Sequence, residues 1–264
     1  MINSEQKGKH IFTGAVILLL LFIAAGIWSI QALVRYERQR DLNTWQITLN
    51  VMADNRAAQL RQWAGAQFAK LNELAANGSL QLYTQNLLRR PKTTSGMEPA
   101  QLSYLRNLIR VTAERDGFAD NSQTGPLVPA NIAFEANAGL SLIGPGAAVI
   151  TTTRGMPALN NGLRQAVTKV IKSGRQRLYG VFKSNGGHVL VGFLTPVFAL
   201  QMPSGGKQVI AVLVGLKNAA ESLFPLLTSG SVVTHSDEAL LIRRNGDLVT
   251  YVSPLADGTP PLER

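Results

Sequence analysis

The feature that most constrains this chain is an uncharged run of 24 residues near its N-terminus, from Ile11 to Val34. A helix rises about 1.5 Å per residue, so roughly 20 apolar residues cross the hydrocarbon core of a bilayer. Inside lipid the backbone must satisfy its own hydrogen bonds, and a helix does so. The run therefore predicts a transmembrane helix at 11–34, preceded by a short cytoplasmic tail at 1–10.

Two other interpretations of this run compete with an anchor. Lys7 and Lys9 followed by Ala24–Gly26 have the pattern of a signal peptide with a cleavage site. The apolar run continues for eight residues past that site, which a cleaved signal does not need. A buried core helix is the second alternative, but an uncharged run of this length is too long for an ordinary one. An uncleaved anchor is therefore favoured.

The orientation of the anchor does not follow from charge. Lys7 and Lys9 precede the run, and Arg35, Arg38 and Arg40 follow it, so the positive-inside count is nearly balanced. The chain has no cysteine, which fits an oxidising compartment. We expect a single pass through the inner (cytoplasmic) membrane, with the bulk of the chain periplasmic or extracellular.

The charge balance is strongly basic, with a formal net charge of +10 from 26 Lys and Arg against 16 Asp and Glu. Nucleic acid is the usual partner of such a chain. Here the charges are scattered, and no zinc or RNA-binding signature accompanies them, so no nucleic-acid partner is expected. The pattern indicates a solvated surface that tolerates anionic headgroups or acidic ligands.

After the anchor, apolar residues recur at helical spacing and predict a long stalk helix from Arg35 to about Arg90. Asn77–Ser79 marks a break in it. Its stripe must bury against its own globular domain or a second copy of the chain, and we expect a parallel homodimer through the stalk. The stripe residues are Leu42, Trp45, Leu49, Met52, Leu60, Trp63, Leu71 and Leu74.

The remaining residues predict an α+β fold, in which helices flank an antiparallel sheet. One hairpin is marginal alone, so the last part is expected to be an incomplete second unit. The expected helices are 98–115, 158–173 and 218–227, the strands are 140–143, 147–153, 178–183, 189–200 and 208–216, with a short one near 132–134, and the final hairpin pairs 239–243 with 248–252.

Six segments carry a resemblance to a known family. They are Ser222–Leu227, Thr234–Glu238, Leu240–Asp247, Tyr251–Leu255, Gly192–Val197 and Gln208–Leu216. These segments resemble the double Cache sensor modules of bacterial receptors: the first four are similar to the linker and first hairpin of a membrane-proximal Cache unit, and the last two to the last strands of a membrane-distal unit. The resemblance covers Arg35 to Leu255 and implies a PAS-like sheet, with a distal sensor unit at 35–230 and the start of a proximal unit at 231–264.

The resemblance implies the ligand-sensing input module of a membrane signalling receptor, of the diguanylate cyclase, histidine kinase or chemoreceptor type. Its expected partner is a small extracytoplasmic ligand, and its output domain is absent from this chain. The aromatic-and-arginine pattern of the amino-acid-sensing branch is not found. The alternative is a membrane-anchored envelope module that binds a partner protein, and an anchored hydrolase ranks last.

No signature of catalysis, metal binding or a cofactor occurs in the sequence. His10, His188 and His235 lie far apart, and no nucleophile elbow or phosphate loop is present. The protein is therefore not expected to be an enzyme.

Candidate ligand-binding residues follow from the sheet, because one face can meet a helix and leave the other for a ligand. Aromatic residues on the strands and one arginine with a planar fork are the candidates. The alternative is core packing for the aromatics and solvent for the arginine and histidine. The candidates are Arg154, Tyr179, Phe182, His188, Phe193 and Thr195.

Overall fold

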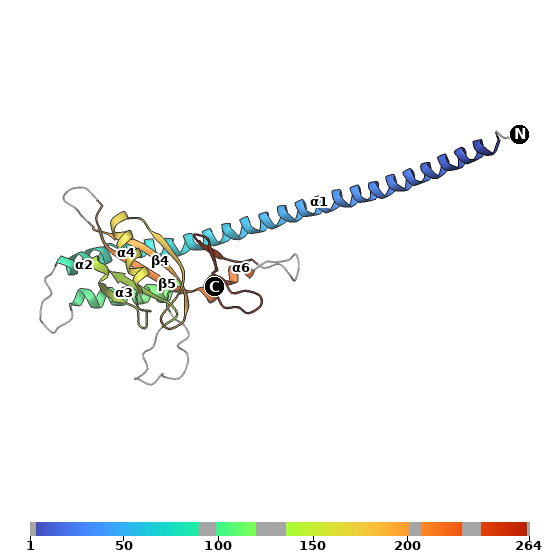
Figure 1. The fold of residues 1–264 in the computed structure, drawn as a ribbon. Helices are drawn as coiled ribbons and strands as arrows, with labels where there is room; N and C mark the ends of the chain where they lie inside the picture. The colour runs from blue at the N-terminus through green and yellow to red at the C-terminus, as the bar shows by residue number, and fades with distance from the viewer. Residues whose placement is uncertain (1–3, 90–98, 120–135, 201–206, 229–238, 263–264) are drawn as a thin grey trace. The chain divides into compact units, whose positions relative to one another are not determined.

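A computed structural model describes residues 4–89, 99–119, 136–200, 207–228 and 239–262, with some side chains in the first helix left out. The chain divides into two compact units, Met1–Asn55 and Arg56–Arg264. The first unit is one stretch of helix. The second unit contains the sheet and the helices that cover it (Figure 1).

One helix, α1 (Ser4–Ala75), runs through both the predicted anchor and the predicted stalk. It ends at the predicted break, where the Asn77 side chain accepts a hydrogen bond from the Leu80 amide at 3.0 Å. That contact satisfies one of the free amides at the start of α2 (Gly78–Arg89). A third helix, α3 (Ala100–Asp116), follows.

Among the described residues, no helix is long and apolar enough to cross a membrane. Of the predicted span at 11–34, the side chains of 11–17, 19, 20 and 24 lie outside the described residues.

Five antiparallel strands form the central sheet in the order β2-β1-β5-β4-β3. The first strand, β1, therefore pairs with the fifth across a long sequence separation and carries β2 on its outer side, while β3, β4 and β5 form a meander. The strands are β1 (Gly139–Ile143), β2 (Val149–Thr152), β3 (Arg177–Lys183), β4 (Val189–Phe198) and β5 (Val209–Asn218), with a 3-10 turn, η1 (Pro145–Ala147), between β1 and β2.

Helices cover both faces of the sheet. On one face, α1, α2 and α3 bury an apolar cluster that includes Leu71, Leu105 and Phe193. On the other face, α4 (Asn161–Ser173) packs Leu163 and Val167 against the same sheet. The sheet is therefore the middle of three layers, and neither face is left open.

The chain caps α4 at both ends with residues suited to the task. The Asn160 side chain accepts a hydrogen bond from the Leu163 amide at 2.8 Å. Gly174 ends the helix at φ 64°, in the left-handed region that glycine adopts without strain.

The C-terminal residues pack on the same unit. Two short helices, α5 (Ala219–Ser222) and α6 (Pro225–Thr228), follow β5, and a separate hairpin pairs β6 (Ile242–Asn245) with β7 (Leu248–Tyr251). Arg243 of the hairpin donates a hydrogen bond to the Val181 carbonyl of the edge strand β3. Val252 is buried in the first core cluster.

The predicted α+β class, long N-terminal helix and antiparallel sheet are confirmed. The strand expected near 132–134 lies outside the described residues, as does the segment 234–238. The boundaries at 34/35 and 230/231, and the incomplete second unit, stay predictions.

Candidate functional site

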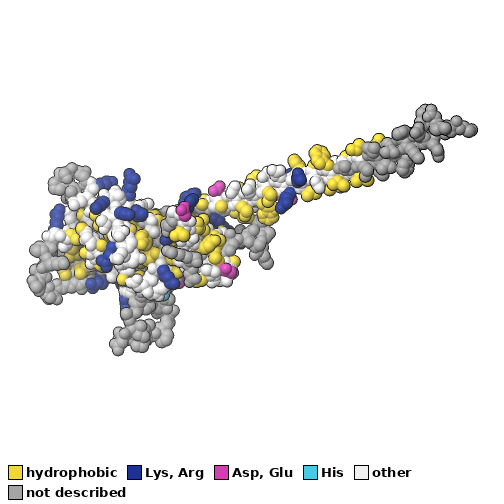
Figure 2. Space-filling model, in the orientation of Figure 1, with side chains coloured by type: hydrophobic (Ala, Val, Ile, Leu, Met, Phe, Trp, Pro, Cys, Tyr) yellow, Lys and Arg dark blue, Asp and Glu magenta, His cyan; other side chains and the backbone are white. Residues whose placement is uncertain are grey.

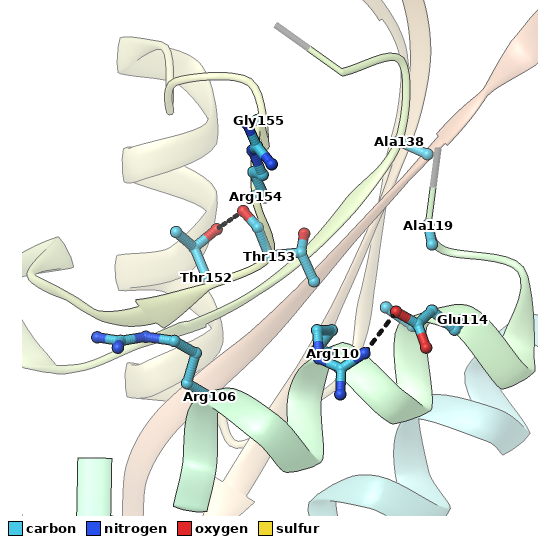
Figure 3. Close-up of a pocket in the computed structure, with 10 residues that line it drawn as sticks. Arg106, Arg110, Glu114, Ala119, Ala138, Thr152, Thr153, Arg154 and Gly155 are labelled. Atoms are coloured by element: carbon cyan, nitrogen blue, oxygen red, sulfur yellow. Dashed lines mark hydrogen bonds and ion pairs between the residues drawn. The ribbon is translucent and has the colours of Figure 1, made fainter. Parts of the chain in front are cut away.

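A cleft opens between α3 and the edge strand β2, and we call it the α3–β2 cleft (Figure 3). Its volume is about 570 Å³. It lies at the edge of the sheet rather than on a face, because both faces are filled by helices. Its walls are Arg106, Arg110, Ala113 and Glu114 of α3, Ala119, Ala138, Thr152 at the end of β2, and the turn residues Thr153, Arg154 and Gly155.

Packing of α3 on the sheet aims two arginines into this cleft. Leu105, Ile109 and Ala113 form the buried side of α3. Arg106 and Arg110, one helical turn apart, line the cleft from α3, and Figure 3 shows Arg110 reaching toward Glu114. Arg154 enters from the opposite wall, just after β2.

One acidic side chain accompanies these arginines in the lining. Glu114 pairs with Arg110 at 2.9 Å, four residues apart on α3. Both side chains are more than half exposed, at 57% and 53%, so the pair contributes little to stability. The Thr153 hydroxyl accepts a hydrogen bond from the Leu140 amide at 3.1 Å, which fixes the turn that carries Arg154.

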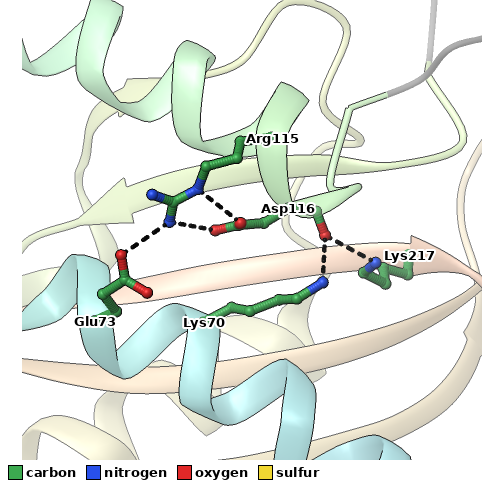
Figure 4. A network of polar contacts seen from close by, with 5 residues as sticks. All are labelled: Lys70, Glu73, Arg115, Asp116 and Lys217. Atoms are coloured by element: carbon green, nitrogen blue, oxygen red, sulfur yellow. Dashed lines mark hydrogen bonds and ion pairs between the residues drawn. The ribbon is translucent and has the colours of Figure 1, made fainter.

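A polar network holds the end of α3 (Figure 4). The Asp116 carbonyl accepts hydrogen bonds from Lys70 of α1 at 3.2 Å and from Lys217 of β5 at 3.3 Å. Burial, with the nearby Lys70 charge, lowers the pKa of Lys217 to about 8. The Lys217 ammonium also lies 4.6 Å from the centre of the Phe118 ring.

The Asp116 carboxylate is buried and takes part in the same network. Arg115 donates to both of its oxygens, at 2.9 and 3.0 Å, and also reaches Glu73 of α1 at 3.2 Å. The hydrogen bond with Asp116 raises the pKa of Arg115 above its ordinary value. The helix that carries two cleft arginines is therefore joined to both α1 and β5.

The six residues predicted from sequence do not converge on one cavity. Arg154 lines the α3–β2 cleft. Tyr179 and Phe182 pack together on the α4 side of the sheet, with their ring centres 5.1 Å apart. Phe193 is fully buried on the opposite side. Among the residues that the structure describes, helices therefore cover both faces of the sheet, including the face expected to hold a ligand.

The other two predicted residues also lie away from the cleft lining. Thr195 lies two residues after Phe193, on the same face of β4, and is buried, and its hydroxyl has no hydrogen-bond partner among the described residues. His188 is exposed in the turn between β3 and β4, where its amide donates to the Ser184 hydroxyl at 3.3 Å. Contact of these residues with a ligand stays a prediction.

Sequence reasoning missed Arg106 and Arg110. On an amphipathic helix, arginines outside the apolar stripe normally indicate a solvated face. Their spacing with Glu114, four residues at each step, places all three on one side of α3 and was a usable signal. In the described part of the chain, no three His, Cys, Asp or Glu residues gather as metal ligands.

Comparison with known proteins assigns no family. No family model matches the chain, and no curated protein matches it. Solved structures with a likeness include the ligand-binding domain of the Campylobacter jejuni chemoreceptor Tlp3 in complex with L-valine, at 8% identity and a TM-score of 0.33, covering 74% of this chain and 87% of that one.

The same Tlp3 domain in complex with L-norvaline has a TM-score of 0.34 at 8% identity, covering 74% of this chain and 85% of that one. These neighbours are chemoreceptor ligand-binding sensory domains. A likeness at this TM-score leaves the function of the present chain to be interpreted from its own residues.

Proposed function

We propose that this chain is the extracytoplasmic ligand-sensing input module of a bacterial membrane signalling receptor, and that its ligand binds in the α3–β2 cleft. The observation that carries the proposal is the cleft itself, with about 570 Å³ of space. Small-molecule sites typically have volumes of about 300–1,000 Å³ and a few convergent polar groups. The helix-flanked antiparallel sheet agrees with the resemblance of the sequence to Cache sensor units.

A route for the signal follows from the network at the end of α3. Lys70 of α1 donates to the Asp116 carbonyl, so a ligand that displaces α3 changes a contact on α1. Packed helices tend to have discrete arrangements, which lets a small shift be passed on. From Lys70, α1 continues without a break to Ser4, through the uncharged run that we propose as the membrane anchor.

A homodimer through α1 is part of the proposal. Leu42, Trp45 and Leu49 recur on one stripe and are 58%, 45% and 50% exposed, and Figure 2 shows hydrophobic side chains at the surface of the long helix. A second copy of this helix would bury them. The chain has no native cysteine, so cysteines placed one at a time along 42–52 give clean cross-linking sites. We expect cross-linking to peak at stripe positions, and no symmetric dimer at any position would contradict the homodimer.

Blocking the cleft tests the sensor function. A panel of small molecules is screened by thermal shift against the full chain in mild detergent. Thr152→Trp places an indole in the cleft, and Val149→Trp on the same strand is the matched control, because Val149 is 53% exposed and outside the lining. We expect stabilising compounds to lose their effect only with Thr152→Trp. Compounds that act equally on both variants bind elsewhere.

A second candidate function is supported by the β6–β7 hairpin. Ile242 and Tyr251 face each other across it and are 60% and 40% exposed, and Val249 beside them is 51% exposed. An exposed apolar group of this kind fits a protein partner in the envelope. Ile242→Asp should abolish co-purification of such a partner and leave binding in the cleft unchanged.

A further inference from the structure

The charge of the α3–β2 cleft suggests what kind of ligand it takes. Three guanidinium groups and one carboxylate line it, which is a net charge of +2. The arginines come from both walls, two from α3 and one from the turn after β2 (Figure 3). A ligand in the cleft is therefore placed between positive charges.

We infer that the cleft binds a small dianion, such as a dicarboxylate, and this inference rests on the proposed sensor function. Arginine presents a planar fork that matches carboxylate and phosphate oxygens with two parallel hydrogen bonds. A dianion balances the net charge of the lining. A ligand without charge would leave the net positive charge of the lining unbalanced.

The available donors favour Arg154 as the principal contact. Arg110 already shares its charge with Glu114 at 2.9 Å. Within the described part of the chain, the side chain of Arg154 makes no hydrogen bond or ion pair and is exposed in the cleft. The hydroxyl of Thr153 accepts from the Leu140 amide and keeps its own proton for a second acceptor.

The uncharged part of the lining agrees with a compact polar ligand. Ala113, Ala119, Ala138 and Gly155 supply small groups, and the described residues of the lining include no aromatic ring. Small side chains leave room beside the arginines, and the carbon atoms of the lining can contact the short carbon skeleton of a dicarboxylate. The charged groups then distinguish a dianion from a neutral compound of the same shape.

Titration calorimetry on the full chain in mild detergent tests this inference. The probes are succinate, inorganic phosphate and neutral succinamide, which has the carbon skeleton of succinate without its charge. Arg154→Gln is the test variant. Arg177→Gln is the matched control, because Arg177 is exposed on β3 at the other edge of the sheet.

We expect succinate, phosphate or both to bind the native chain and succinamide not to bind. Arg154→Gln should weaken binding at least about tenfold, since it removes a hydrogen bond to a charged group. Arg177→Gln should leave binding unchanged. Added salt should weaken binding as well, because the cleft is open to solvent. The thermal midpoint without ligand shows whether each variant is folded.

The results separate the two proposals. Equal binding of succinate and succinamide, equal effects of the two arginine variants, or dianion binding that survives Thr152→Trp each overturn the dianion inference. If a neutral compound binds and Thr152→Trp abolishes its binding, the sensor function stands and the ligand class is wrong. If neither a dianion nor any panel compound binds in the cleft, both proposals fail.

Discussion

The ammonium group of Lys217 donates a hydrogen bond to the backbone carbonyl of Asp116 across 3.3 Å, which joins β5 to the last residue of α3. Lys70 of α1 donates to the same oxygen at 3.2 Å. The free carbonyls at the end of a helix normally attract cations. Here the cations come from two other elements, so this oxygen connects three segments that lie far apart in the sequence.

Lys217 should make stability depend on pH. Its pKa is lowered from 10.5 to about 8 in the folded chain. Between pH 8 and 10.5 Lys217 keeps its proton in the unfolded chain and has lost it in the folded chain. The free energy of unfolding therefore increases as the pH rises through this range. Urea unfolding at pH 7.5, 8.5 and 9.5 should show this gain in the native chain relative to Lys217→Met.

The exposed Lys172 on α4 provides the control for that experiment. Lys172→Met should follow the native chain at every pH. A constant difference between the native chain and Lys217→Met over the whole range would contradict the lowered pKa.

Phe193 should be a structural residue. Its ring lies edge-on to Trp63, Phe68 and Phe118, with ring centres 5.5, 5.3 and 6.3 Å away. Phe193→Ala should reduce the free energy of unfolding by about 3–5 kcal/mol, the usual range for truncating a buried aromatic. Phe182→Ala should have a smaller effect because Phe182 is half-buried. Equal losses in urea unfolding would contradict this assignment.

Gly215 leaves no room for a side chain. A Cβ atom there would lie 2.7 Å from Cε1 of Phe118, a fully buried ring. Gly215→Ala should destabilise the fold by about 1–3 kcal/mol through overpacking. Gly65→Ala is the control, since a Cβ on this helical residue meets nothing within 4 Å. This substitution should raise the free energy of unfolding by about 0.5–1 kcal/mol. Urea denaturation curves of both variants measure the two effects. An unchanged midpoint for Gly215→Ala would contradict the predicted overpacking against Phe118.

Arg243 should hold the β6–β7 hairpin against the sheet. Its guanidinium donates to the Val181 carbonyl of β3. Arg243→Gln should therefore raise amide hydrogen exchange in residues 242–251 while the five-stranded sheet stays protected. Arg244→Gln is the control, because Arg244 donates to Gly246 within its own hairpin at 3.0 Å. Similar exchange in the two variants would show that Arg243 is not the attachment.

Local patterns predicted most elements because the signals lie within a few residues. Gly174 ends α4, and the Asn185–Gly187 turn connects β3 to β4. Long-range pairing is different, since the contact of β1 with β5 joins residues such as Gly139 and Leu216. No short segment encodes that partner, so the five strands could be predicted from the sequence but the pairing of β1 with β5 could not.

The candidate site was harder to predict because tertiary packing creates it. Arg154 was expected at a ligand, but its neighbours on α3 were not, since only the docking of α3 against β2 brings them close. The sequence also did not show which side chains of β3 lie on which face of the sheet. A bulge between Leu178 and Gly180 interrupts the alternation of side chains, so Tyr179 could not be assigned to a face by counting.

The α3–β2 cleft has a consequence for how such a protein can evolve. Its arginines and Glu114 are exposed, and the apolar clusters that hold the sheet lie beneath and beside them. Substitutions at exposed positions usually change stability by less than about 0.5 kcal/mol. In the proposed site, ligand preference could therefore diverge between descendants while the fold is inherited intact, and a library confined to positions 106, 110, 114 and 154 would vary the lining of the cleft on an unchanged scaffold.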